Sequence, residues 1–510
     1  EEKMRFKNNK KKKKILGPIT VMLIISAVIM IASLITSSLG VRAERTVIVN
    51  GKLETSLITP NNILSIDGIK YLFSNILLNF KMFEPLVLFI ISLIAYGIAD
   101  ASGLLQMLFK PFRRIKPYFI TMLVVLLGFI STMIGEYSFV ILMPLVGYLY
   151  KYINRNSVLG IVTVFLGITL GYASGIIFNY DTYLLGTLTQ MAATIDVDPN
   201  YTYNNFSTLY IMLASMAVMV PILAKLIDVK IAPKFKKPLL EESDSNYSKK
   251  GLIFSAVAFV IMTLIVVYLI VPGFLGSGIL LDNNQTTYIA KLFTTGAPFK
   301  EGIMLIFLIM MMVCSFIYGK ISKNIETSKG FTESLSKSLY NSGYLFALMF
   351  FASQMIAILD WTGLGELVTC KIVEVLSMFQ FSGALLIFVF FILVVVMTLV
   401  MPSTLGKWTV VSPLIVPLFM RSNITPDLTQ FIFQVADGIG KSITPLYAFF
   451  IVLLGFMHHN NADEDYDISV FGTIKLILPT VLIMLAFWIV FIIIWYLSGF
   501  PLGISGYTTL

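Results

Sequence analysis

The chain has 510 residues, of which 57% are hydrophobic and 13% are charged, and its mean hydropathy is +0.87. Soluble domains carry about a quarter charged residues, so this composition excludes an ordinary soluble enzyme and indicates one polytopic membrane domain over residues 1–510. The formal charge of +9 is concentrated in loops and in residues 1–14, directly before an apolar run. Such a flank is typical of the cytoplasmic side of a first span near anionic lipid. We therefore expect membrane lipid, and no nucleic acid, as a partner.

The first part of the chain, residues 15–227, predicts four spans and one re-entrant hairpin. Apolar segments long enough to cross a bilayer lie at about 15–39, 84–108, 158–195 and 208–227. Residues 41–82 form a polar external segment with a strand-like RTVIVNGKL. Residues 118–150 have basic groups at both ends, which predicts a re-entrant hairpin that enters from the cytoplasm and has its tip near Gly135–Ser138. Two short spans are the alternative, although neither half is comfortably long enough to cross.

The second part, residues 251–510, repeats this order after a cytoplasmic linker at 228–250. Spans at about 252–272, 301–319, 338–358 and 470–498 accompany a hairpin at 379–420 and a broken helix at 426–457. The first part also ends in a broken helix, at 158–195, and the two units enter from opposite faces. The sequence thus predicts an all-α polytopic membrane protein with nine transmembrane helices and two re-entrant hairpins in an inverted repeat. The N-terminus is expected in the cytoplasm and the C-terminus outside.

Two glycine-interrupted helices with polar centres, at 171–186 and 426–457, indicate the class of function. Broken helices in corresponding positions of two halves are typical of secondary transporters, which bind their substrate near the midplane of the bilayer. A membrane-embedded enzyme would need metal ligands or a nucleophile and base within the spans, but the only histidines, His458 and His459, fall in a predicted loop. A channel would show a polar stripe along continuous helices. We therefore expect a transporter driven by an ion gradient, and no enzyme.

The stretch 401–445 carries the polar groups that this function needs. Irregular polar backbone persists in lipid only where it lines a cavity, and ionisable groups at that depth are functional candidates. Asp437 and Lys441 lie four residues apart and face each other on a helix. Three roles are open: the two form a neutralising ion pair, the Lys441 ammonium occupies a cation site, or Lys441 attracts an anionic substrate. Trp408 is either a stacking surface for an aromatic substrate or an interfacial anchor. Asp181 has no neighbouring basic residue, which suits proton or Na⁺ coordination unless it faces water.

Several longer stretches carry a family resemblance. They are GEYSFVILMPL at 135–145, FFASQMIAILDWTGLG at 350–365, PSTLGKWTVVSPLIVPLFM at 402–420, PDLTQFIFQVADGIGKSITPL at 426–446 and WYLSGFPLG at 495–503. With them the chain resembles the AbgT family of transporters over most of its length. The resemblance implies a homodimer with nine transmembrane helices and two hairpins per subunit. It also implies cation-coupled transport of p-aminobenzoyl-glutamate or related folate catabolites, or in some members export of sulfonamide antimetabolites.

The resemblance and the polar pattern together assign the candidate residues. The expected substrate-binding residues are Ser403, Trp408, Pro426, Asp437, Lys441, Thr444 and Pro445. The expected ion-coupling residues are Glu136, Asn179, Asp181 and Asp437, with Na⁺ near Asp181 and Asp437 and no other cofactor. The chain departs from the family pattern at Leu405, Gln434 and Lys441, where the family usually has serine, arginine and asparagine, and at Glu136, where aspartate is common. Loss of an arginine weakens the case for a di-anionic cargo, because a guanidinium is the natural fork for a carboxylate.

Overall fold

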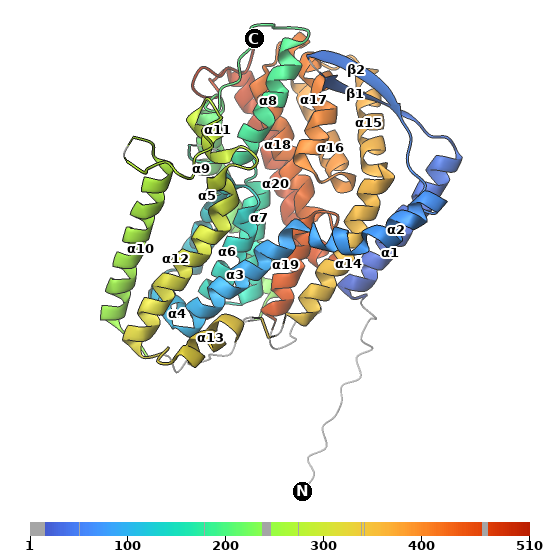
Figure 1. The fold of residues 1–510 in the computed structure, drawn as a ribbon. Helices are drawn as coiled ribbons and strands as arrows, with labels where there is room; N and C mark the ends of the chain where they lie inside the picture. Colours follow the sequence, from blue (N-terminus) through green and yellow to red (C-terminus); the bar gives the residue numbers. More distant parts are fainter. Residues whose placement is uncertain are drawn as a thin grey trace.

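The computed structural model describes residues 16–49, 51–177, 179–236, 246–273, 275–337, 339–340, 342–461 and 468–510. The predicted basic N-terminus and residues 237–245 of the predicted linker lie outside these ranges. Over the described ranges the chain is mostly helical (Figure 1), and nine helices are long and apolar enough to cross a membrane. A bent pair of helices would make a tenth span. Helix α1 begins at one end of the molecule, and the chain ends at the other (Figure 1).

The N-terminal elements confirm the predicted first span and the strand, and they add a helix. The first span is α1 (Pro18–Ser38), and it is followed by the antiparallel strands β1 (Ala43–Val49) and β2 (Lys52–Ile58). Helix α2 (Ile66–Lys81) occupies part of the predicted external segment, for which the sequence predicted a strand but no helix. Its N-cap is Ser65, whose hydroxyl accepts a hydrogen bond from the Gly68 amide at 3.2 Å. This helix leads directly into α3 (Glu84–Ala101), α4 (Leu104–Phe109) and the 3₁₀-helix η1 (Lys110–Arg114).

The predicted first hairpin consists of α5 (Pro117–Ser131), η2 (Thr132–Ile134) and α6 (Tyr137–Tyr152). Its tip turns at Gly135, whose φ of +59° is a left-handed conformation that glycine adopts without a Cβ clash. The two ends of the hairpin lie close together: the Arg155 guanidinium, after α6, donates a hydrogen bond to the carbonyl of Pro117, the first residue of α5, at 3.1 Å. The chain therefore leaves this segment on the side where it entered, as a re-entrant hairpin does. The first broken helix follows as α7 (Ser157–Leu170) and α8 (Tyr180–Thr194).

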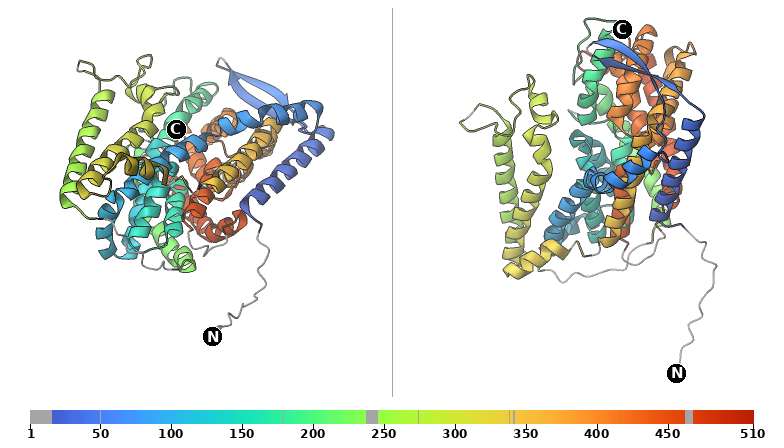
Figure 2. Two further views of the ribbon diagram at one scale, coloured as in Figure 1. Left: turned by 60° about the horizontal axis from the view of Figure 1, so that its bottom comes forward. Right: turned by 45° about the vertical axis from the view of Figure 1, so that its right-hand side comes forward.

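The middle of the chain contributes three long helices and several short ones. It consists of α9 (Leu209–Leu226), the π-helix η3 (Ile227–Ile231), η4 (Ala232–Lys234), α10 (Lys249–Ile270), α11 (Tyr288–Phe293), α12 (Pro298–Ser322) and α13 (Ser328–Lys337). Helices α10 and α12 pack on each other and stand at one side of the body (Figure 2). Only 6% of the apolar window of α10 is buried, so its surface is available to lipid or to a partner subunit.

The second part contains the matching hairpin and broken helix. The hairpin is α16 (Gly383–Val400) and α17 (Thr404–Arg421), and Phe390 and Phe419 pack across it with ring centroids 5.1 Å apart. The broken helix is α18 (Pro426–Ile443) and α19 (Ala448–His459), whose axes bend by 42° at the break. The remaining helices are α14 (Gly343–Thr362), α15 (Leu364–Ser377) and α20 (Val470–Ser498). Helix α15 is not anticipated by the span pattern, and it begins after a left-handed turn at Gly363.

Helix α18 lies at the centre of the fold. It packs against α7, α8, α16 and α20, and almost every residue in it is buried. Two glycines allow this close approach. A Cβ on Gly438 would lie 2.3 Å from the Thr169 carbonyl oxygen of α7, and one on Gly440 would lie 2.5 Å from the Thr398 Cβ of α16. Small residues at such crossings let helix backbones pack closely within a membrane. The arrangement brings both helix breaks and both hairpin tips into one region.

Candidate functional site

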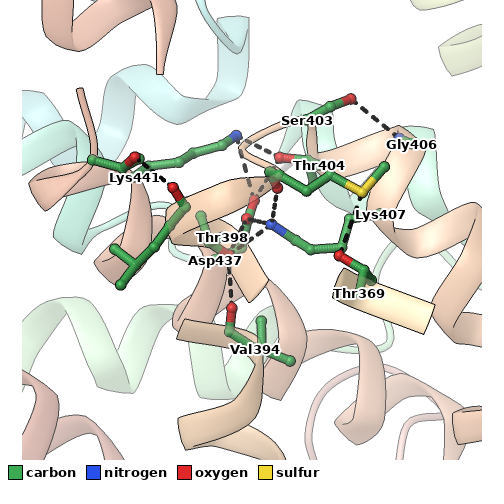
Figure 3. A network of polar contacts seen from close by, with 12 residues as sticks. Thr369, Val394, Thr398, Ser403, Thr404, Gly406, Lys407, Asp437 and Lys441 are labelled. Carbon is green, nitrogen blue, oxygen red and sulfur yellow. Dashed lines mark hydrogen bonds and ion pairs between the residues drawn. The ribbon is translucent and has the colours of Figure 1, made fainter. Parts of the chain in front are cut away.

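Asp437 is the centre of a buried polar network (Figure 3). The Lys407 ammonium lies 2.6 Å from its Oδ1, and the Lys441 ammonium lies 3.4 Å from its Oδ2. The Thr398 and Thr404 hydroxyls donate to the same carboxylate at 3.0 and 2.5 Å. All three charged side chains are at most 1% exposed. A charge at this depth is tolerated only when it is paired and hydrogen-bonded, so these groups stabilise one another.

The tip of the second hairpin supplies half of this network. Residues 401–403 are not helical, and the Ser403 hydroxyl caps α17 by accepting from the Gly406 amide at 3.3 Å. The break leaves the Met401 carbonyl without a helical partner, and the Lys407 ammonium donates to it at 2.8 Å. The tip is therefore held in place by the same lysine that neutralises Asp437.

Lys441 joins the second hairpin to the first broken helix. Its ammonium donates to the Tyr172 hydroxyl at 2.7 Å and also to the Thr404 hydroxyl. It lies 4.1 Å from the centroid of the Tyr172 ring and 4.9 Å from that of Tyr447, so two aromatic faces contribute cation–π attraction. The predicted ion pair with Asp437 is present, and it is only one of several contacts of this lysine.

The break in the first broken helix is organised by Asn179. Its side-chain amide donates to the carbonyls of Tyr172 and Ser174, both at 2.9 Å, and its oxygen caps α8 by accepting from the Thr182 amide at 3.0 Å. Asp181 follows in the first turn of α8 and is 4% exposed, so it does not face open water. Its Oδ2 has no hydrogen-bond partner within the described ranges. A buried carboxylate oxygen without a partner is a candidate for binding a proton or a cation.

A cavity of ≈ 450 Å³ lies beside the network. It is lined by both hairpin tips, through Glu136 and Ser403, and by the second break, through Tyr447. The Tyr447 hydroxyl donates to Glu136 at 3.2 Å and so connects the first hairpin tip to the second broken helix. Three more carboxylates line the cavity, those of Glu84, Asp360 and Glu366, and no Lys or Arg is among its described lining residues. The cavity is acidic, and the two lysines lie behind its wall.

The remaining predicted substrate residues take structural positions. Trp408 is fully buried, packs on Phe433 with ring centroids 4.4 Å apart, and donates from its indole nitrogen to Thr189 at 3.0 Å. It does not line the cavity, so stacking on a cargo would require another conformation. Pro426 opens α18 at the end opposite the break.

Thr444 and Pro445 lie in the second break. The Thr444 hydroxyl donates to the Leu399 carbonyl at 2.9 Å, which ties the break to the second hairpin. Thr444 and Pro445 therefore lie beside the network, whereas Pro426 lies at the other end of α18.

The candidate set omitted Lys407, Tyr172 and Tyr447. Lys407 carried a local signal, because a lysine directly after a polar break in an apolar segment needs a buried partner. The tyrosines carried none, since tyrosine is common in membrane helices and their contacts join distant parts of the chain. Gln434, which stands where the family has arginine, accepts from the Thr182 hydroxyl at 3.0 Å.

Comparison with known proteins identifies the family. The model of the "AbgT putative transporter family" matches residues 9–510. The chain belongs to the AbgT family. It is 24% identical to the p-aminobenzoyl-glutamate transport protein of Escherichia coli K12 over 503 residues, which cover 96% of this chain and 94% of the relative.

Two solved structures are similar to this AbgT-family chain over nearly their full lengths. The YdaH transporter of Alcanivorax borkumensis is 23% identical, with 96% of this chain and 100% of that chain covered and a TM-score of 0.49. MtrF of Neisseria gonorrhoeae, described with a class of antimetabolite efflux pumps, is 25% identical, with 97% and 98% covered and a TM-score of 0.49.

Proposed function

We propose that this AbgT-family protein is a secondary active transporter of p-aminobenzoyl-glutamate or a related aromatic folate catabolite, driven by an H⁺ or Na⁺ gradient. The observation that carries the proposal is the acidic cavity where two hairpin tips and a helix break converge beside a buried charge network. Secondary transporters bind their cargo at such junctions, where irregular backbone supplies polar groups. The name of the Escherichia coli relative supports the choice of cargo.

The lining of the cavity suits the aromatic amine end of this cargo. An arylamine donates two hydrogen bonds, and Glu136 and Asp360 present carboxylate acceptors in the cavity wall. The glutamyl end carries two negative charges and needs positive charge. Lys441, whose ammonium lies 4.9 Å from the centroid of the Tyr447 ring in the cavity wall, is the candidate to supply it.

Export of sulfonamide-type antimetabolites is the second candidate function. These compounds share the aromatic amine but lack the two carboxylates of the glutamyl group. The absence of a basic residue among the described lining residues favours them, as does Gln434 in place of an arginine. A small carboxylate of another kind would fit the scaffold but leaves the arylamine acceptors unused.

The proposed setting is the cytoplasmic membrane, with the N-terminus inside, the C-terminus outside and two subunits per transporter. The basic residues of the loop before α5 and of the turn after α6 support this orientation, since short cytoplasmic loops are rich in lysine and arginine. The resemblance supports the homodimer. We propose that the protein is a transporter without enzymatic activity. We also propose that the carboxylates of Asp181 and Glu136 bind the coupling cation.

Uptake into proteoliposomes tests the proposal. Radiolabelled p-aminobenzoyl-glutamate is offered with an inward Na⁺ gradient, with a pH gradient, and with neither. Accumulation that requires one gradient supports the proposed function and names the ion. No accumulation by folded protein in either gradient, together with sulfonamide transport in the same vesicles, would contradict the first cargo and support the second.

A further inference from the structure

The oxygen atoms around the Lys441 ammonium form a cluster that would suit a bound metal cation. The Tyr172 hydroxyl lies at 2.7 Å, the Thr404 hydroxyl is in hydrogen-bonding contact, and Asp437 Oδ2 lies at 3.4 Å. Hydroxyl and carboxylate oxygens are the ligands that hard cations prefer. The cluster draws on three separate elements, namely the first break, the second hairpin tip and α18, so a cation here would hold the moving parts of a transporter together.

The same geometry leaves no room for Na⁺ beside Asp437. Lys407 occupies Oδ1, and Lys441 together with the Thr404 hydroxyl occupies Oδ2. A metal ion bound there would lie against two ammonium groups in a site where water does not screen the repulsion. The Na⁺ site that the sequence predicts near Asp437 therefore does not fit these residues.

We propose that the Lys441 ammonium is a built-in cation that occupies the site formed by Tyr172, Thr404 and Asp437, in the place where Na⁺ would otherwise bind. This inference rests on the proposed transport function for its meaning but not for its test. Lys441 supplies the positive charge that a bound ion would bring to this site, and it does so permanently. The ion that drives this transporter must then act elsewhere, and Asp181, whose Oδ2 has no hydrogen-bond partner among the described residues, is a buried carboxylate beside the first helix break.

Electrostatics support a fixed cation at this position. Lys441 lies 3.4 Å from Asp437 Oδ2, and Glu136 accepts a hydrogen bond from Tyr447, whose ring centroid lies 4.9 Å from the Lys441 ammonium. Removing Lys441 would leave Asp437 Oδ2 and the hydroxyls of Tyr172 and Thr404 without a cation, and an external cation would be drawn to that place.

Binding of ²²Na⁺ to purified protein in detergent tests the inference without any cargo. The wild type, Lys441→Asn and the double variant Lys441→Asn/Asp437→Asn are compared at equilibrium. We expect Lys441→Asn to gain a saturable site of about one Na⁺ per chain relative to the wild type, and the double variant to lose it. Lys441→Gln should gain the same site, and it replaces Lys441→Asn if that variant is not monodisperse. The matched control is Lys371→Asn, which removes an exposed lysine paired with Glu374 and should leave Na⁺ binding unchanged.

Two results would overturn the inference. One is equal Na⁺ binding by the wild type and by both folded Lys441 variants. The other is a gained site that persists when Asp437 is also replaced. A wrong cargo would show only in the uptake assay and would leave the binding result intact, so failure of this inference and failure of the proposed function can be told apart.

Discussion

At the scale of single residues, the most consequential feature is one aspartate shared by two lysines. Burying an ion costs several kcal/mol, and the cost is recovered only when the partners and hydrogen bonds are all present. Asp437 satisfies this condition with Lys407, Lys441 and two threonine hydroxyls. The network is consequently sensitive to the loss of any one charged member.

Replacing Lys407 by methionine should lower the free energy of unfolding by about 3–5 kcal/mol, because it removes the closer of the two counter-charges of a buried carboxylate. Lys371→Met breaks an exposed pair on α15 and should cost less than about 1 kcal/mol. Titration with SDS in mixed micelles, followed by circular dichroism, measures both. Equal losses in the two variants would show that the buried pair contributes no more than a surface one.

Two asparagines each cap the N-terminus of a helix through the side-chain oxygen, one near the site and one away from it, and they make a matched pair. Asn156 caps α7 at the base of the first hairpin, and Asn179 caps α8 at the helix break. Each alanine variant should lose about 1 kcal/mol of helix-capping energy. Asn179→Ala should in addition abolish most uptake at normal expression, because it also removes a donor from the Tyr172 and Ser174 carbonyls at the break. Normal uptake by Asn179→Ala would show that transport does not depend on the contacts that Asn179 makes at the helix break.

At the scale of elements, the position of α18 depends on its two glycines. A methyl group on Gly438 would collide with the backbone of α7, and one on Gly440 with α16. We expect Gly438→Ala to lower the unfolding free energy by about 1–3 kcal/mol through overpacking. Gly302→Ala in α12, where a Cβ would meet nothing within 4 Å, should be neutral or slightly stabilising. SDS titration of the pair measures the difference, and a tolerated Gly438→Ala would mean that α7 and α18 are free to separate.

The elements that could be predicted are those with a local signal. Apolar length and basic flanks predicted the spans, and the glycine and proline positions predicted both breaks and both hairpin tips. Helices α2 and α15 were missed for a physical reason. Each lies outside the span pattern and is stabilised by packing on neighbouring elements, α2 on α14 and α15 on α16 and α17.

The candidate site was predictable only in part, for the same reason. The Asp437–Lys441 pair is four residues apart on one helix, so its spacing revealed it. The pair between Lys407 and Asp437 spans 30 residues, and the contact between Tyr447 and Glu136 spans 311. No periodicity encodes such contacts, because they depend on how separate elements of the fold pack together.

At the scale of the whole molecule, the inverted repeat places two kinds of structure in one region. The hairpin tips supply non-helical backbone, and the broken helices supply helix ends, of which the start of α8 is capped by Asn179. The cavity between them touches both halves of the chain, through Glu136 and Ser403, so relative movement of the halves would change its shape. Movement of one repeat against the other is the usual basis of alternating access.

The central claim is that cargo binds in this cavity, and cysteine labelling tests it most directly. Ser403 lines the cavity and is exposed, whereas the native Cys314 and Cys370 are buried, so a Ser403→Cys variant should react with a polar thiol reagent against a low background. Saturating p-aminobenzoyl-glutamate should slow this reaction. It should leave unchanged the labelling of Ser377→Cys, which is exposed on α15 away from the cavity, and Ser442→Cys, which is fully buried, should stay unlabelled. Labelling of Ser403→Cys that is unaffected by cargo, in vesicles that accumulate that cargo, would contradict the assignment of the cavity.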